Sequence, residues 1–129
     1  MLDSLRQYKA GIFQALGNPT RVAIVELLNE AELSVTQLCS KLDLEQSNVS
    51  QHLAVLRNNH IVQTRKDGNQ IFYRLSDPVF GQLLQALRHF FLRNITEAVA
   101  SLQREDRAGK VEARVTRRGG RKPNRVGGR

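Results

Sequence analysis

The sequence has 129 residues, of which 40% are hydrophobic, and its 20 Lys and Arg against 12 Asp and Glu give a net charge of +8. This length predicts one domain with a small core, and no apolar run approaches the roughly 20 residues that span a membrane. The single cysteine, Cys39, excludes an intrachain disulfide, and charged residues interrupt any signal-peptide pattern at the N-terminus, so we expect a cytoplasmic protein.

Three helices are predicted in the first third of the chain. The first covers about residues 2–16, where apolar side chains fall roughly on one side. Asn18-Pro19 supplies a good N-cap and a suitable first residue for a second helix over about residues 19–30. The segment Ser34–Gln37 has the S-x-x-Q form of a capping box and predicts a short third helix to about residue 42.

A fourth helix is predicted from about residue 46 to residue 58. Val49, Leu53 and Leu56 would fall within about 60° of one another and dock on the domain. Asn and Gln can pair with adenine, and Ser with several bases, so short neutral side chains suit the outer face of a DNA recognition helix. The plainer interpretation is an ordinary surface helix with some capping residues. For His52, the alternative to a DNA contact is a histidine at the edge of the buried side that packs or caps locally. The candidate DNA-binding residues of this helix are Gln46, Ser47, Asn48, Ser50, Gln51 and His52.

A β-hairpin and a long last helix are predicted next. Asp67-Gly68 is a strong hairpin signal between arms at Ile61–Lys66 and Gln70–Leu75, and Asp77-Pro78 begins the last helix. Two short helices joined by a tight turn and followed by a hairpin predict a mainly α, winged helix-turn-helix fold with a β-hairpin wing. The wing would offer charge to phosphates, or it is merely a charged edge that resists aggregation. Its candidate DNA-binding residues are Arg65, Lys66, Asn69 and Arg74.

The positive charge is concentrated at the C-terminal end of the chain. Residues 1–102 hold 10 Lys and Arg against 9 Asp and Glu, a net +1, whereas residues 103–129 hold 10 against 3, a net +7. The second segment is rich in Gly and Arg and lacks apolar periodicity, which predicts a disordered basic tail. We therefore expect a domain at 1–102 and a tail at 103–129 that either binds nucleic acid or only solubilises the protein.

Three stretches, QALGNPTRVAIVELL, ELSVTQLCSKLDLEQSNVSQHLAVLRNNHIV and TRKDGNQIFYRL, resemble the ArsR/SmtB family of winged-helix repressors. The resemblance covers roughly residues 10–92. It implies a homodimer formed by the first and last helices, and repression by occupying double-stranded promoter DNA until a signal releases the protein. The long apolar last helix independently favours a partner. The candidate dimer-interface residues are Leu5, Ile12, Phe80, Leu84, Leu87, Phe91 and Ile95.

The sequence departs from the metal-sensing members of that family. Ser34 and Thr36 stand where the family's first site has two cysteines. At the second site the matching positions are Asp77, Val79, Phe90 and Arg93, of which only Asp77 could be a ligand. We therefore predict no metal at either site and no cofactor.

Cys39 matches the first of two cysteines in a redox-sensing branch of the family, and the second position, near Leu92, lacks a thiol. Cys39 is either a single-thiol sensor or a small buried apolar residue. The sequence does not identify an inducer: an unknown signal, control by a co-regulator protein and constitutive repression all agree with it.

The leading hypothesis is a sequence-specific dimeric repressor. A sequence-tolerant nucleic-acid binder driven by the basic tail is the second hypothesis, and a regulator whose winged helix docks on protein is the third. An enzyme is not expected, because the sequence offers neither a nucleophile with a base nor a phosphate-binding loop.

Overall fold

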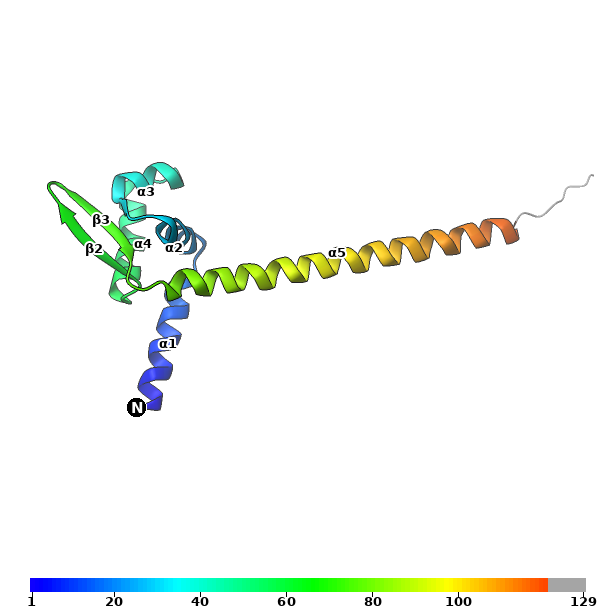
Figure 1. Cartoon of the computed structure of the whole chain (residues 1–129), viewed down its shortest axis with the longest axis horizontal. Coiled ribbons are helices and arrows are strands. Elements are labelled where there is room, and N and C mark those ends of the chain that lie inside the picture. The colour runs from blue at the N-terminus through cyan, green and yellow to red at the C-terminus, as the bar shows by residue number, and fades with distance from the viewer. Residues whose placement is uncertain (121–129) are drawn as a thin grey trace, which may run out of the picture. The chain divides into compact units, whose positions relative to one another are not determined.

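The computed structural model describes the backbone of residues 1–120 and the side chains of residues 1–111. It has the winged helix-turn-helix fold that the sequence predicts, with a three-stranded sheet in place of a simple hairpin. Contacts divide the chain into two units, residues 1–87 and residues 88–129. In chain order the elements are α1 (Leu2–Leu16), α2 (Pro19–Glu30), β1 (Leu33–Ser34), α3 (Val35–Leu42), α4 (Gln46–Asn58), β2 (Val62–Asp67), β3 (Gln70–Leu75) and α5 (Val79–Gly120) (Figure 1).

The predicted starts of α2 and α3 are confirmed by their caps. The side-chain oxygen of Asn18 accepts hydrogen bonds from the amides of Thr20 and Arg21, at 2.9 and 3.2 Å. Ser34 and Gln37 form the predicted capping box: the Gln37 amide donates to Ser34 Oγ at 3.1 Å, and the Ser34 amide donates to Gln37 Oε1 at 2.8 Å. These bonds satisfy backbone donors that the first turns of α2 and α3 would otherwise leave unpaired.

The sheet has the antiparallel order β1-β3-β2. The hairpin of β2 and β3 lies where it was predicted, and the turn at Gly68 has a φ of 62°, a left-handed conformation that favours glycine. The sequence analysis missed β1, whose Leu33 and Ser34 pair with Tyr73 and Phe72 of β3. This two-residue strand is too short to give a periodic signal, and it joins the wing directly to the start of α3.

One hydrophobic core holds the helices and the sheet of the first unit together. All of its members are apolar and at most 9% exposed, and each helix from α1 to α4 contributes at least one of them. The core explains why both helices of the helix-turn-helix have a fixed place in the domain. Its members are Ile12, Ala15, Leu16, Ile24, Val25, Leu28, Leu33, Leu38, Val49, Leu53, Leu56, Ile61, Val62 and Phe80.

The last helix is longer than predicted. α5 continues through Gly120, so residues 103–120 are helical where the sequence analysis predicted a disordered tail, and residues 121–129 lie outside the described residues. The reason lies in composition: Arg, Lys, Glu and Ala are strong helix formers and lie between the glycines of this segment. Lys110 and Asp106 also form an i,i+4 ion pair at 3.2 Å. Within residues 1–120, no helix is long and apolar enough to cross a membrane.

Candidate nucleic-acid interface

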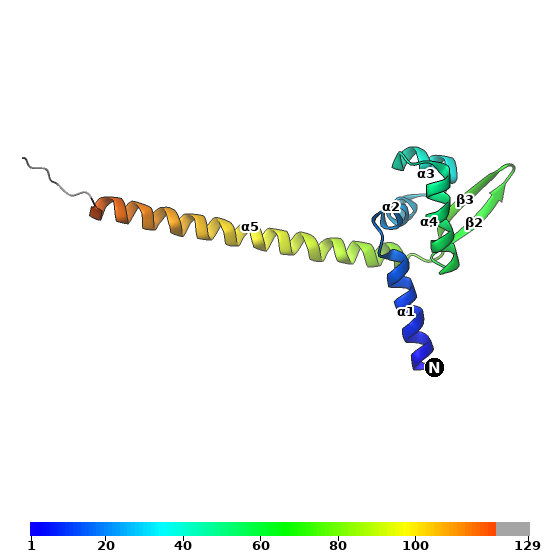
Figure 2. The ribbon, with the colours of Figure 1, turned by 180° about the vertical axis from the view of Figure 1, so that it is seen from behind.

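A short turn joins the two helices of the helix-turn-helix. Asp43 caps the C-terminal end of α3 and adopts a left-handed conformation with φ 54° and ψ 48°. The amide of Leu44 donates to the Cys39 carbonyl at 3.1 Å and closes the turn. Aspartate tolerates this conformation better than most residues, which lets α4 follow α3 directly. Figure 1 and Figure 2 both show α4 running on from the end of α3, and β2 packs against α4.

α4 has a buried side and an exposed side, as predicted. Val49, Leu53 and Leu56 are 0%, 1% and 0% exposed and anchor the helix in the core. At its N-terminal end, no side chain caps the helix, so its first backbone amides are free of side-chain acceptors and could donate to a phosphate. We call the polar surface above the anchors the α4 outer face; its residues, all exposed, are Gln46, Ser47, Asn48, Ser50 and Gln51.

His52 lies at the edge of this face and is half-buried. Its Nδ1 is 3.2 Å from Nη1 of Arg21, and because a guanidinium can only donate, Nδ1 accepts and Nε2 carries the ring proton. Arg21 also donates to the carbonyls of Ala15 and Gln14 at the end of α1. Arg21 therefore ties α1 to α4, a role that the sequence analysis missed because the partners are distant in sequence.

The wing holds Arg65 in an intramolecular network rather than leaving it free. Its Nε donates to Glu32 Oε1 at 2.8 Å and its Nη2 also contacts that oxygen, while Nη1 is 3.5 Å from Asp67. The guanidinium lies over the ring of Phe72, 4.8 Å from the centroid. The hydrogen bond with Glu32 raises the pKa of Arg65 above its ordinary value. Arg65 thus reaches from β2 across β3 to the residue before β1, and two carboxylates offset its charge.

The other predicted wing residues are exposed. Lys66 and Asn69 lie at the hairpin end, next to the turn at Gly68. Arg74 lies further along β3, where it donates to the neutral Gln63 Oε1 at 3.1 Å. Among the side chains of residues 1–111, no carboxylate lies within bonding distance of Lys66 or Arg74.

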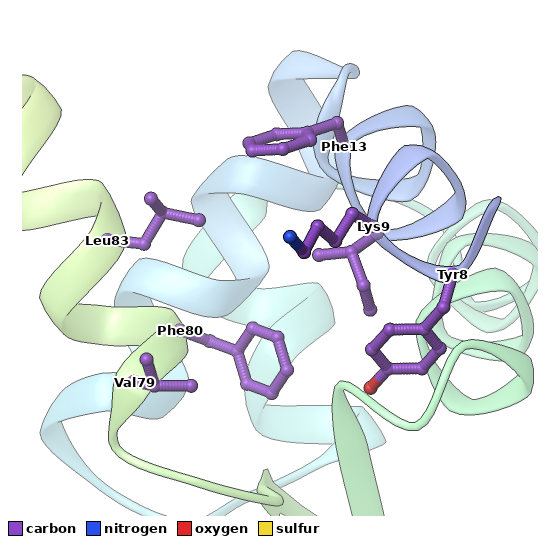
Figure 3. Close-up of a pocket in the computed structure, with 7 residues that line it drawn as sticks. Tyr8, Lys9, Phe13, Val79, Phe80 and Leu83 are labelled. Carbon is purple, nitrogen blue, oxygen red and sulfur yellow. The ribbon is translucent and has the colours of Figure 1, made fainter. Parts of the chain in front are cut away.

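Exposed apolar side chains gather on α1 and α5. Of the large hydrophobic residues of the described side chains that are exposed, all except Met1 and Ile71 belong to these two helices. Between α1 and the first turns of α5, a hollow of about 310 Å³ opens beside Tyr8, Phe13 and Phe80, with Lys9 at its edge (Figure 3). Exposed surface of this kind is typical of a protein interface.

The seven predicted interface residues do not share one environment. Ile12 and Phe80 are each 9% exposed and belong to the core of their own chain. Leu84 is half-buried against that core. The remaining four, Leu5, Leu87, Phe91 and Ile95, are 43–59% exposed.

The positions that correspond to metal ligands and to a reactive thiol have ordinary structural surroundings. Ser34 is buried and caps α3, whereas Thr36 is exposed. Cys39 is half-buried and packs against the core. Among the described side chains, no group of three or more His, Cys, Asp or Glu residues is arranged to hold a metal ion.

Comparison with known proteins assigns this geometry to a group of regulators. The family model described as "Bacterial regulatory protein, arsR family" matches residues 18–64, from the cap of α2 into β2. An uncharacterized HTH-type transcriptional regulator of Mycobacterium tuberculosis, Rv0081, is 40% identical over 102 residues, 78% of this chain and 90% of the relative. Its crystal structure matches with a TM-score of 0.68 over 74% of this chain and 96% of the other.

Other relatives include both a repressor and an activator. A biofilm growth-associated repressor of Agrobacterium fabrum is 40% identical over 62% of this chain and 68% of its own length. The transcriptional activator HlyU of Vibrio cholerae is 39% identical over 62% of this chain and 74% of its own length. The structure of reduced HlyU matches with a TM-score of 0.63 and 34% identity, over 70% of this chain and 95% of that chain.

Proposed function

Because the chain belongs to the arsR family of bacterial regulatory proteins, which are transcriptional regulators and not enzymes, we propose that it is a homodimeric repressor of an inverted-repeat operator. The observation that carries this proposal is the α4 outer face: exposed neutral side chains stand on a helix whose opposite side is fully anchored in the core. A recognition helix needs both properties, since base contacts require accessible polar groups held in a fixed position.

In this proposal α4 reads bases in the major groove. Asn48 and Gln51 would pair with base edges, because amide side chains match the donor and acceptor pattern of adenine. Gln46, Ser47 and Ser50 would add bonds to bases or phosphates. His52 would donate from Nε2 to a phosphate, since Arg21 occupies Nδ1.

The wing would add affinity without reading sequence. Lys66, Arg74 and Asn69 are exposed and can contact phosphates, which carry no sequence information. Arg65 would serve mainly to hold the wing in place through Glu32, and its contact with phosphate would require exchange of that partner.

A second copy of the chain would cover the exposed apolar surface of α1 and α5. Leu5, Leu87, Phe91 and Ile95 would lie in this interface, and the hollow lined by Tyr8 and Phe13 would be covered as well. A two-fold dimer would place two α4 helices in successive major grooves, with half-sites about 34–36 Å apart.

Release from DNA would not use the metal sites of the family, because Ser34, Thr36, Val79, Phe90 and Arg93 replace ligands there. The signal would be a thiol reaction at Cys39, a partner protein or another inducer. Calorimetry of the purified protein with zinc tests whether these sites bind metal, and stoichiometric tight binding would refute the prediction that they do not.

The function is tested by selecting bound fragments from the organism's own genomic DNA and then measuring Gln51→Ala. The variant should lose about 1–3 kcal/mol on the selected operator and little on a random duplex, as expected when a bidentate base contact is lost. Gln85→Ala, the same change at an exposed position of α5, is the matched control and should bind as the wild type does. Equal losses on both duplexes would exclude α4 as the reader of sequence.

The net charge of +7 in residues 103–129 favours a second candidate, a sequence-tolerant nucleic-acid binder. The same selection separates the two functions. A repressor enriches a few promoter fragments, whereas a sequence-tolerant binder recovers the genome without preference.

A further inference from the structure

The end of α5 changes character after Leu102. Up to that residue the exposed side chains include many large apolar ones, among them Phe90, Phe91 and Leu102 itself. From residue 103 to residue 120 the helix holds six Lys and Arg residues against three acidic ones, and its large apolar residues are only Val111 and Val115. This segment, which we call the basic extension, therefore lacks the apolar surface that a dimer interface needs.

The basic residues of the extension fall on one side of the helix. With about 100° per residue, the positions of Arg104, Arg107 and Lys110 lie within an arc of about 120°, and Glu105 and Asp106 lie outside it. The sequence positions 114, 117 and 118, all arginine, extend this arc to only about 140°. Random placement would spread the charges around the axis, so the arrangement produces one strongly positive face.

Two of the described basic side chains of this face have a neutral or an exposed partner. Arg104 donates to the neutral Oγ of Ser101 at 3.1 Å. Lys110 pairs with Asp106, but that contact is exposed on both sides, with 70% and 66% of the side chains accessible, so it exchanges readily with water or another anion. The face is thus open to an external polyanion.

The residues on the opposite side of the extension indicate which polyanion binds to the basic face. A helix that lies on a membrane places Trp, Phe or Leu opposite its basic residues. Here the described residues outside the basic arc include Ala108 and Gly109, which offer little apolar surface to lipid, and Glu105, which would repel anionic headgroups. A nucleic-acid backbone needs only the positive side of the helix, and its phosphates form a rigid linear array.

We propose that the basic extension, residues 103–120, is a second nucleic-acid contact that binds the phosphates of duplex DNA independently of sequence. Its basic positions from 104 to 118 extend over about 21 Å of helix, a length over which a duplex presents about 12 phosphate charges. The choice of duplex DNA rests on the proposed function, since the winged helix would bring the extension to DNA. The extension itself anchors the protein and leaves the choice of sequence to α4.

The test compares two full-length variants that each remove two positive charges. Arg104→Gln with Arg107→Gln changes the proposed face, and Arg6→Gln with Arg93→Gln changes exposed helix positions elsewhere. Binding to a random-sequence duplex of about three helical turns is followed by fluorescence anisotropy between about 0.05 and 0.2 M salt. Circular dichroism checks that both variants keep the helical content of the wild type.

Relative to the control variant, the first variant should lose about 1.8 units of salt slope per chain and about 30-fold in affinity per chain at ~0.15 M salt, since each phosphate contact contributes about 0.9 units. Its preference for a selected operator over random DNA should persist. Equal slopes for the two variants would overturn the proposal. So would a selective loss of binding to phosphatidylserine vesicles with duplex binding unchanged, which would identify a membrane contact.

The two proposals fail separately. A wild-type protein without any sequence preference, combined with a selective loss of slope in the first variant, would refute the repressor function and keep the extension as a DNA contact. A clear operator preference combined with equal salt slopes for the two variants would support the repressor function and refute the extension as a DNA contact.

Discussion

Truncation of Leu53 to alanine should destabilise the protein strongly, because this side chain anchors α4 and is 1% exposed. The change removes three carbon groups, and their transfer from the core to water contributes about 2.4 kcal/mol at ~0.8 kcal/mol each. A remaining cavity of about 50 Å³ adds about 1.2 kcal/mol at ~24 cal/mol per Å³. The sum, about 3.6 kcal/mol, is a large part of the 5–15 kcal/mol that is typical of a folded domain.

The assay is guanidinium unfolding followed by circular dichroism at a fixed protein concentration, since dimerisation would make the midpoint depend on concentration. Gln51→Ala is the control on the same helix: its side chain is exposed, so the free energy of unfolding should change by less than about 0.5 kcal/mol. A loss below about 1 kcal/mol for Leu53→Ala, or a loss above that for Gln51→Ala, would refute the assignment of anchored and outward sides of α4.

Three further outcomes are expected. Glu32→Gln should tighten binding to operator and random duplex alike, because it removes a negative charge that offsets the positive charge of Arg65. Glu30→Gln removes the same charge at an exposed site, and equal affinities of these two variants would contradict the role of the network. Ser34→Ala should lower the free energy of unfolding by about 0.5–2 kcal/mol through loss of the α3 cap, measured by the same denaturant assay; a change near zero would show that the cap is dispensable. Phe91→Asp should shift the sedimenting mass from twice 14.6 kDa to 14.6 kDa with helicity retained, and a mass of 14.6 kDa for the wild type would refute the dimer.

The parts of the fold that could be predicted are those with local signals. Asn18 and the pair Ser34 and Gln37 marked helix starts because a cap depends on residues three positions apart or fewer. Gly68 marked the hairpin because few residues adopt its backbone conformation. The anchored side of α4 followed from apolar spacing alone, which is why the outward position of Gln51 was also correct.

The features that could not be predicted depend on residues distant in sequence or on balance between weak effects. Arg21 and His52 are 31 positions apart, and Arg65 and Glu32 are 33 apart, so spacing gives no indication of either contact. The phosphate contact of Arg65 stays a prediction, whereas its contact with Glu32 could not be predicted because Glu32 precedes a strand too short to detect. The helix over residues 103–120 could not be predicted because the segment holds both kinds of signal: its glycines and high charge favour disorder, whereas its Arg, Lys, Glu and Ala favour a helix.

Ser34 belongs to the sheet and to the helix-turn-helix at once, since it pairs with Phe72 of β3 and caps α3. Because Val35 follows it directly as the first residue of α3, no flexible linker lies between the wing and that helix. The sheet and α3 are therefore joined without a loop, so a displacement of the hairpin would move α3 as well. Together with the contacts between β2 and α4, this connection favours a fixed angle between the wing and α4, so the proposed DNA interface would be formed before DNA binds.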